Sequence, residues 1–140
     1  MTKLTFEALS ELHANAFAGQ GRSWSAEEFA SLLIEQNAFV CADRFSFAVG
    51  RVVADEAELL TIATDPRRQR SGLAQARLLE FEKVAKTRGA QRAFLEVAES
   101  NWAAVQLYET NGYLKVATRK DYYQMDKRTR VDAVIMEKKL

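Results

Sequence analysis

The stretch QRSGLA (residues 69–74) decides how this sequence of 140 residues is read. It lies between a strand-like run, AELLTIAT (57–64), and a long amphipathic helix that we expect over residues 71–88. The first amides of a helix lack internal partners and lie at its positive dipole end, so they can bind a phosphate. Gly72 has no Cβ and would let the backbone approach such a ligand closely. An ordinary basic loop with one glycine looks the same, so this turn alone does not identify a ligand.

The elements on both sides of this turn predict a parallel crossover. Gly89 is placed to end the helix in the left-handed conformation, and QRAFLEVA (91–98) follows as a strand. Two strands joined through a helix at this spacing lie parallel in one sheet. The turn lacks the Gly-Lys-Ser signature of a nucleotide P-loop and the three glycines of a dinucleotide fingerprint.

The first half of the chain is expected to form two helices and two strands. A helix is predicted over residues 6–17. Ser25 and Glu28 form a capping box for a second helix that should reach residue 36, and Trp24 could pack on Phe29 beside this cap. Strand-like runs at 38–42 and 45–54 are joined to 57–64 by short turns, which predicts antiparallel pairing.

The second half completes a mixed sheet. Asn101 is placed to cap a helix over 102–110, and strands are expected at 113–122 and 132–137. We therefore expect one domain over residues 1–140, of the α/β (α+β) class, with a mixed central β-sheet and helices on both faces.

Composition excludes several classes of function. The chain is 48% hydrophobic and 28% charged, and its net charge of +1 gives no indication of a nucleic-acid partner. Cys41 is the only cysteine and His13 the only histidine, so an internal disulfide is impossible and no metal site is predicted. We interpret both residues as structural. Without a signal segment or membrane-length apolar run, the protein is expected to be cytoplasmic, with no membrane and no direct nucleic-acid partner.

Three motifs in order resemble the GNAT superfamily of acetyltransferases. They are the Gln-x-x-Gly-x-Ala turn after IATDP, the segment FLEVAESNWAAVQLYETNGY (94–113), and the ending RKDYYQ followed by DAVIMEK. The ending is similar to that of the RimI-type branch, bacterial enzymes that acetylate the N-terminal alanine of a small-subunit ribosomal protein. The resemblance is weaker in the first half, where SWSAEEF (23–29) is the main match.

The resemblance implies the GNAT fold, acetyl-CoA as co-substrate, and a protein N-terminus as acceptor, without a covalent acyl-enzyme. A splay or bulge near residues 62–64 would free an amide to polarise the thioester carbonyl. The residues it assigns to acetyl-CoA are Ile62, Ala63, Thr64, Arg70, Ser71, Gly72, Leu73, Ala74, Gln75 and Asn101.

The resemblance also assigns two catalytic residues. Glu96 matches the general base that takes a proton from the acceptor amine, and Tyr108 matches the acid that protonates the departing thiolate. From the sequence alone, Glu96 is better explained as an exposed strand residue, and Tyr108 fits an amphipathic packing residue. Tyr122 and Tyr123 would border the acceptor groove, in a hairpin whose basic tip carries Lys127.

Two departures from the RimI-type pattern leave the acceptor open. Ser23 stands where a proline is usual, and Ala98-Glu99 replaces a basic-then-small pair. A lysine side chain or a small amine therefore remains an alternative acceptor, and a non-catalytic acetyl-CoA-binding module remains an alternative function. The sequence does not determine the oligomeric state, the need for a partner, or the role of Arg128 and Arg130 in the basic tip.

Overall fold

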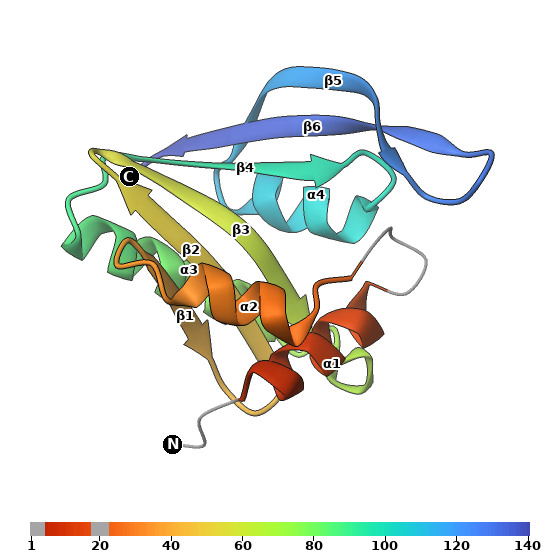
Figure 1. The fold of residues 1–140 in the computed structure, drawn as a ribbon. Coiled ribbons are helices and arrows are strands. Elements are labelled where there is room, and N and C mark those ends of the chain that lie inside the picture. Colours follow the sequence, from red (N-terminus) through yellow and green to blue (C-terminus); the bar gives the residue numbers. More distant parts are fainter. Residues whose placement is uncertain (1–4, 18–22) are drawn as a thin grey trace.

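The computed structural model describes residues 5–17 and 23–140, and within them it contains a six-stranded sheet of order β1-β2-β3-β4-β6-β5 (Figure 1). β3 and β4 are parallel, and the other neighbours are antiparallel. The mixed sheet predicted from the sequence is confirmed. The strands are β1 Ala38–Ala42, β2 Ser46–Val53, β3 Glu56–Thr64, β4 Arg92–Ala98, β5 Leu114–Gln124 and β6 Arg130–Lys139.

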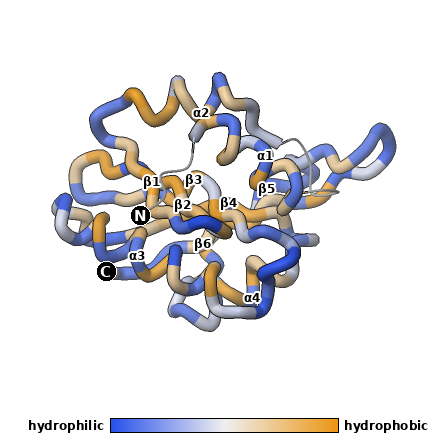
Figure 2. The backbone as a smooth tube through the Cα atoms, turned by 90° about the horizontal axis from the view of Figure 1, so that it is seen from below, coloured by the Kyte–Doolittle hydropathy of each residue, from blue (hydrophilic) through white to orange (hydrophobic). Residues whose placement is uncertain are grey.

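Helices cover both faces of the sheet, as predicted. α1 and α2 lie on one face and α3 and α4 on the other (Figure 1). Figure 2 shows these three layers from below, with hydrophobic positions concentrated along the central strands. The helices are α1 Phe6–Ala16, α2 Ala26–Leu33, α3 Leu73–Thr87 and α4 Trp102–Thr110, with a short 3₁₀ turn at Pro66–Arg68.

The capping box at α2 forms as predicted. The hydroxyl of Ser25 accepts from the backbone N–H of Glu28 at 3.1 Å, and the Glu28 carboxylate accepts from the N–H of Ser25 at 3.2 Å. The ring of Trp24 packs on Phe29 with 5.3 Å between centroids. The predicted end of α2 at residue 36 is wrong, because a turn closed by the Ala38 N–H and the Glu35 carbonyl leads into β1.

The sheet separates two apolar clusters. The cluster under α3 and α4 includes Leu78, Phe81 and Ala85 of α3, on the face predicted from helical spacing. The smaller cluster under α1 and α2 centres on Phe29 and Phe47, which are both fully buried. Each half of the chain therefore packs its helices on a different face of the shared sheet.

The crossover from β3 to β4 places the QRSGLA turn at one end of the sheet. The glycine that follows α3, Gly89, has a φ of 96°, as expected for a helix-ending glycine. No helix in the described part of the chain has the length and apolar character needed to span a membrane.

Candidate active site

β3 and β4 separate along their second halves and open the sheet. Their pairing ends at Leu59 and Leu95, and the described residues beyond that pair form no further pairs between these strands. The two strands diverge from there towards their carboxyl ends (Figure 1). Ligands of α/β sheets bind at such carboxyl ends. The separation thus creates space between two central strands of the sheet.

A β-bulge in β3 changes which face its residues occupy. Val49 of β2 pairs with Thr61, but the next residue, Gly50, pairs with Leu59, so Leu60 is an extra residue. Leu59 packs in the α3–α4 cluster, whereas Thr61 contacts His13 of α1 on the opposite face. The family resemblance suggested a splay or a bulge in this strand, and the structure contains both.

The N-terminus of α3 is open and has no side-chain cap. Gly72 is the N-cap residue with φ 81°, and its carbonyl accepts the first helical hydrogen bond from Ala76 at 3.0 Å. The amides of Leu73, Ala74 and Gln75 precede that bond, so the helix itself gives them no carbonyl partner. A Cβ built at Gly72 would meet nothing within 4 Å, so the space above this turn is open.

This turn lines a cavity of about 450 Å³, which we call the turn cavity. All the residues assigned to acetyl-CoA line it except Ser71, whose hydroxyl donates to the carbonyl of Arg68. The hydroxyl of Thr64 is buried in the wall and has no hydrogen-bond partner among the described residues. Open amides, an unpartnered hydroxyl and a glycine without a Cβ fit a phosphate-bearing ligand.

The three arginines near the turn differ in whether a neighbouring side chain already engages their guanidinium groups. Arg67 pairs with Asp65 at 3.1 Å and holds the pKa of that carboxyl below its usual value. The guanidinium of Arg68 lies over the ring of Phe45, 4.1 Å from its centroid. Arg70 is exposed and adopts φ 63°, an uncommon conformation for a residue other than glycine. Arg68 and Arg70 line the turn cavity and supply its positive charge.

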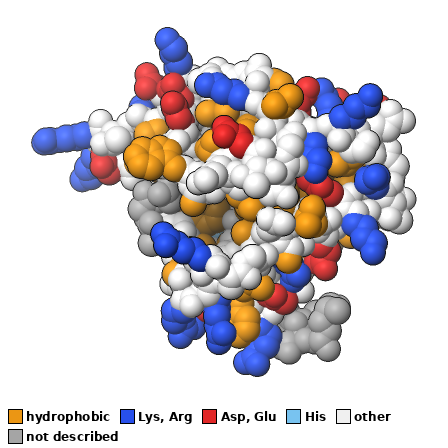
Figure 3. Space-filling view, turned by 180° about the vertical axis from the view of Figure 1, so that it is seen from behind, with side chains coloured by type: hydrophobic (Ala, Val, Ile, Leu, Met, Phe, Trp, Pro, Cys, Tyr) orange, Lys and Arg blue, Asp and Glu red, His pale blue; other side chains and the backbone are white. Residues whose placement is uncertain are grey.

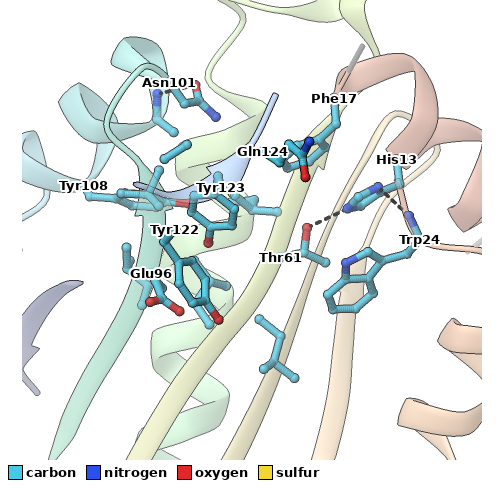
Figure 4. Close-up of a pocket in the computed structure, with 17 residues that line it drawn as sticks. His13, Phe17, Trp24, Thr61, Glu96, Asn101, Tyr108, Tyr122, Tyr123 and Gln124 are labelled. Carbon is cyan, nitrogen blue, oxygen red and sulfur yellow. Dashed lines mark hydrogen bonds between the residues drawn. The ribbon is translucent and has the colours of Figure 1, made fainter. Parts of the chain in front are cut away.

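A second cavity of about 380 Å³, the carboxylate cavity, lies on the other side of the opening in the sheet. Glu96 and three tyrosines gather on one side of it, and His13, Thr61 and Trp24 lie on the other (Figure 4). The two cavities share the lining residues Phe17, Ile62, Asn101 and Ala104. A ligand in the turn cavity can therefore meet a second ligand in the carboxylate cavity. The surface in Figure 3 is hollowed, with hydrophobic side chains in the hollow and basic side chains at its rim.

Glu96 points into the carboxylate cavity because of strand alternation. Its neighbours Leu95 and Val97 are buried under α3 and α4, so Glu96 faces the other side of the sheet. Its Oε1 atom lies 3.1 Å from Nε of Arg119, yet accepts no well-aligned hydrogen bond from the described residues. The carboxylate is thus held by charge and keeps capacity for a further donor.

Tyr108 lines the same cavity from α4 and is 5% exposed. Burial, with a smaller contribution from Tyr123, raises the pKa of Tyr108 above its ordinary value. Burial and the nearby Glu96 raise the pKa of Tyr123 to about 12. Both phenols are therefore protonated at neutral pH and can donate.

Asn101 shows the arrangement expected of a helix cap. Its Oδ1 accepts from the N–H of Ala104 at 3.3 Å. It nevertheless lines both cavities at the place where they join. Asn101 therefore has a structural role as a helix cap, and its contact with a cofactor remains a prediction.

His13 has a role in the cavity wall that was not predicted from the sequence. Its Nδ1 accepts from the backbone N–H of Trp24 at 3.2 Å, so the neutral ring carries its proton on Nε2, 3.1 Å from the Thr61 hydroxyl. His13 thereby ties α1 and the segment before α2 to the bulged part of β3. These segments are far apart in the sequence, and no local pattern signals their meeting. Cys41 is buried, and burial raises the pKa of its thiol to about 12, as suits a structural residue.

Comparisons with known proteins agree with this architecture. The model of the Acetyltransferase (GNAT) family matches residues 7–113. The chain is 36% identical over 129 residues to the [ribosomal protein bS18]-alanine N-acetyltransferase of Escherichia coli (strain K12), covering 90% of this chain and 84% of that protein.

Solved structures give the same result. The crystal structure of the ribosomal-protein-S18-alanine N-acetyltransferase from Escherichia coli has a TM-score of 0.85 and 33% identity, covering 99% of this chain and 90% of that one. The PaiA N-acetyltransferase from Thermoplasma acidophilum, solved in complex with coenzyme A, has a TM-score of 0.76, covers 99% of this chain and 97% of that one, and at 23% identity supports the fold alone. The resemblance to the RimI-type branch is confirmed by these relatives. With a family match over 7–113 and relatives of this similarity, the chain is an acyltransferase that belongs to the acetyltransferase (GNAT) family.

Proposed function

We propose that this protein transfers the acetyl group of acetyl-CoA to the N-terminal α-amine of a protein, with the N-terminal alanine of ribosomal protein bS18 as acceptor. The observation that carries the proposal is the shared wall of the two cavities, which joins an open helix N-terminus to a cavity holding a carboxylate and a phenol. The acceptor is taken from the relative that is 36% identical over most of both chains.

In this proposal the turn cavity binds the co-substrate. Acetyl-CoA supplies an acetyl thioester together with a diphosphate. The open amides of Leu73 to Gln75 and the positive charge of Arg70 suit the diphosphate. The residues Ile62 to Thr64 follow the bulge, where β3 has left β4, and would direct backbone groups at the thioester.

Glu96 acts as the general base in the proposed reaction. An α-amine has a pKa near ~8, so it is mostly charged at neutral pH and must lose a proton before it can attack. The carboxylate of Glu96, with its remaining acceptor capacity, takes that proton directly or through a water molecule. The amine nitrogen then forms a bond to the acetyl carbonyl carbon and releases its second proton to solvent, and the carbon–sulfur bond breaks.

Tyr108 acts as the general acid. It donates its phenolic proton to the departing thiolate and regains one from solvent, so the products are an acetylated amine and free coenzyme A. Burial keeps Tyr108 protonated and also makes it a weaker acid than a free phenol. Its donation therefore depends on the thiolate forming beside it, in the shared part of the two cavities.

A lysine side chain is a second candidate acceptor. Ala98, at one of the two positions that depart from the RimI-type pattern, lines the carboxylate cavity. Acceptor choice could therefore differ from that of the relatives while co-substrate binding stays the same.

The proposal is tested with acetyl-CoA and a synthetic peptide that carries the N-terminal sequence of bS18 from the source organism. Intact and fragment mass spectrometry should find one acetyl group on the α-amine of alanine. The same peptide with a blocked α-amine is the control and should stay unmodified. Acetylation of lysine alone would replace the proposed acceptor with the second candidate, and release of no free thiol with any amine would contradict acetyl transfer.

A further inference from the structure

Three consecutive residues of β5 line the carboxylate cavity. They are Tyr122, Tyr123 and Gln124, and Figure 4 shows all three beside the cavity that also contains Glu96. In a regular strand successive side chains point to opposite faces of the sheet. The pairing of β5 with β6 is irregular at this point, so the alternation of a regular strand does not hold for these three residues.

The irregularity is a bulge opposite Asp132. Arg119 of β5 pairs with Ala133 of β6, and the next pair joins Tyr123 to Val131. Residues 120–122 of β5 therefore lie opposite the single residue Asp132 of β6. Bulges of this kind redirect side chains, and they commonly lie next to active sites.

The side chain of Asp132 holds the centre of this bulge. Asp121 adopts φ 51°, in the left-handed region, which is unfavourable for residues other than glycine and least so for Asn and Asp. The backbone N–H of Asp121 donates to Oδ1 of Asp132 at 2.8 Å. A hydrogen bond to a carboxylate is stronger than one to a neutral group and offsets part of the backbone strain.

Residues at and next to the bulge interact with one another and with Glu96. The rings of Tyr122 and Tyr123 meet edge to face with 5.2 Å between centroids. The guanidinium of Arg119 lies 5.2 Å from the Tyr122 centroid and pairs with Glu96. If the bulge relaxed to a regular strand, one of the two tyrosine rings would turn away from the cavity.

We propose that Asp132 is a positioning residue for acceptor binding, because its carboxylate maintains the bulge that turns Tyr122 and Tyr123 towards the carboxylate cavity. Asp132 itself is absent from the lining of that cavity. The inference deepens the proposed function and depends on it for the acceptor, but the bulge can also be tested without any reaction.

Three variants test the inference by steady-state kinetics with the alanine-terminated peptide. Asp132→Ala removes the acceptor of the Asp121 N–H and should raise KM for the peptide about tenfold, with KM for acetyl-CoA changed less than about twofold. Asp132→Asn keeps a carbonyl oxygen at the same place and should stay within about threefold of the wild type. Adding Asp121→Gly to Asp132→Ala should recover part of the loss, because glycine adopts a positive φ without support.

The matched control is Asp126→Ala. Asp126 makes the same kind of contact in the same hairpin, accepting from the N–H groups of Arg128 and Thr129 at 2.7 Å, but it lies outside both cavities. Its KM for the peptide should equal that of the wild type. The inference is overturned if Asp132→Ala leaves that KM unchanged, if Asp126→Ala raises it equally, or if Asp132→Asn is as impaired as Asp132→Ala.

An NMR measurement separates this inference from the proposed function. Contacts between the aromatic protons of Tyr122 and Tyr123 should be present in the wild type and in Asp132→Asn, and lost in Asp132→Ala. Retention of these contacts in Asp132→Ala would overturn the inference even if the enzyme is active. If the contacts follow this pattern while the wild type fails to acetylate the peptide, the proposed function alone is contradicted.

Discussion

The two cavities share Phe17, Ile62, Asn101 and Ala104 but differ in what forms the rest of each wall. The part of the turn cavity that is proposed to bind the diphosphate depends on the backbone of one short segment, where a glycine with positive φ starts α3 and leaves amides open. The carboxylate cavity depends on side chains that come from α1, the segment before α2, β3, β4, α4 and β5. A site formed by the backbone of one segment can be predicted from the sequence. A site formed by side chains from distant segments can be identified only once the fold is known.

The largest effect expected is on chemistry in the carboxylate cavity. Glu96→Gln keeps the shape of the side chain but removes the base, so kcat should fall by at least about a hundredfold. Affinity for coenzyme A, measured by calorimetry, should change less than about twofold, because the turn cavity is untouched. Glu99→Gln is the matched control, since Glu99 is exposed and lines neither cavity. Equal turnover in Glu96→Gln and the wild type would remove Glu96 from its proposed role.

A smaller loss is expected for the acid. Tyr108→Phe should lower kcat by about tenfold to a hundredfold, because a thiol pKa near ~8.5 allows the thiolate to leave without full protonation. Tyr113→Phe is its control. The Tyr113 hydroxyl donates to Glu82 at 2.9 Å and lies outside the cavity, so this variant should lower the melting temperature and keep kcat. The reverse pattern in the two variants would contradict the assignment of the acid.

The turn cavity is tested by a pair of glycines at the two ends of α3. Gly72 and Gly89 both have positive φ and open space where a Cβ would stand, so alanine at either position should cost similar stability, about 1–2 kcal/mol. Gly72→Ala should in addition weaken coenzyme A binding about tenfold, because the methyl group intrudes where the diphosphate is proposed to bind. Titration calorimetry and thermal melts measure both effects. Similar coenzyme A affinity in the two variants would argue against a backbone site at this turn.

The smallest expected effect is on the stability of the protein at alkaline pH, and it arises from Tyr123 in the carboxylate cavity. Burial raises the pKa of Tyr123 to about 12 in the folded protein, while an unfolded tyrosine titrates near ~10. The unfolded state therefore loses its proton first, so this contribution to stability is complete below pH ~10 and is lost as pH rises beyond it. When the free energy of unfolding is measured by urea titration, its decrease between pH 9 and about 11 should be smaller for Tyr123→Phe than for the wild type. A steeper loss in the variant would contradict this linkage.

Much of the fold follows from local sequence signals. The capping box at Ser25, the glycine at the end of α3 and the parallel crossover depend on neighbouring residues, and all three are confirmed. β1 has the predicted bounds, and β5 continues two residues further than expected. The predicted end of α2 is wrong by three residues, because the turn into β1 competes with the last helical turn.

The site is less visible in the sequence. The resemblance named Glu96 and Tyr108, but the residues that surround them come from other strands and helices, brought near by strand pairing. The bulge at Leu60 depends on how β3 aligns with β2, and the bulge opposite Asp132 depends on how β5 aligns with β6. Strand register is a property of both partners, so neither bulge could be located from one strand, and the resemblance gave only a splay or bulge somewhere in β3.

Assigned NMR amide shifts during sequential addition of coenzyme A and an alanine-terminated peptide test the division into two cavities most directly. Coenzyme A alone should shift the amides of residues 62–64 and 70–75, and the peptide should then shift Trp24, Glu96 and residues 122–124. Shifts from coenzyme A that centre on Trp24 and Tyr122 and leave the start of α3 unchanged would contradict the account.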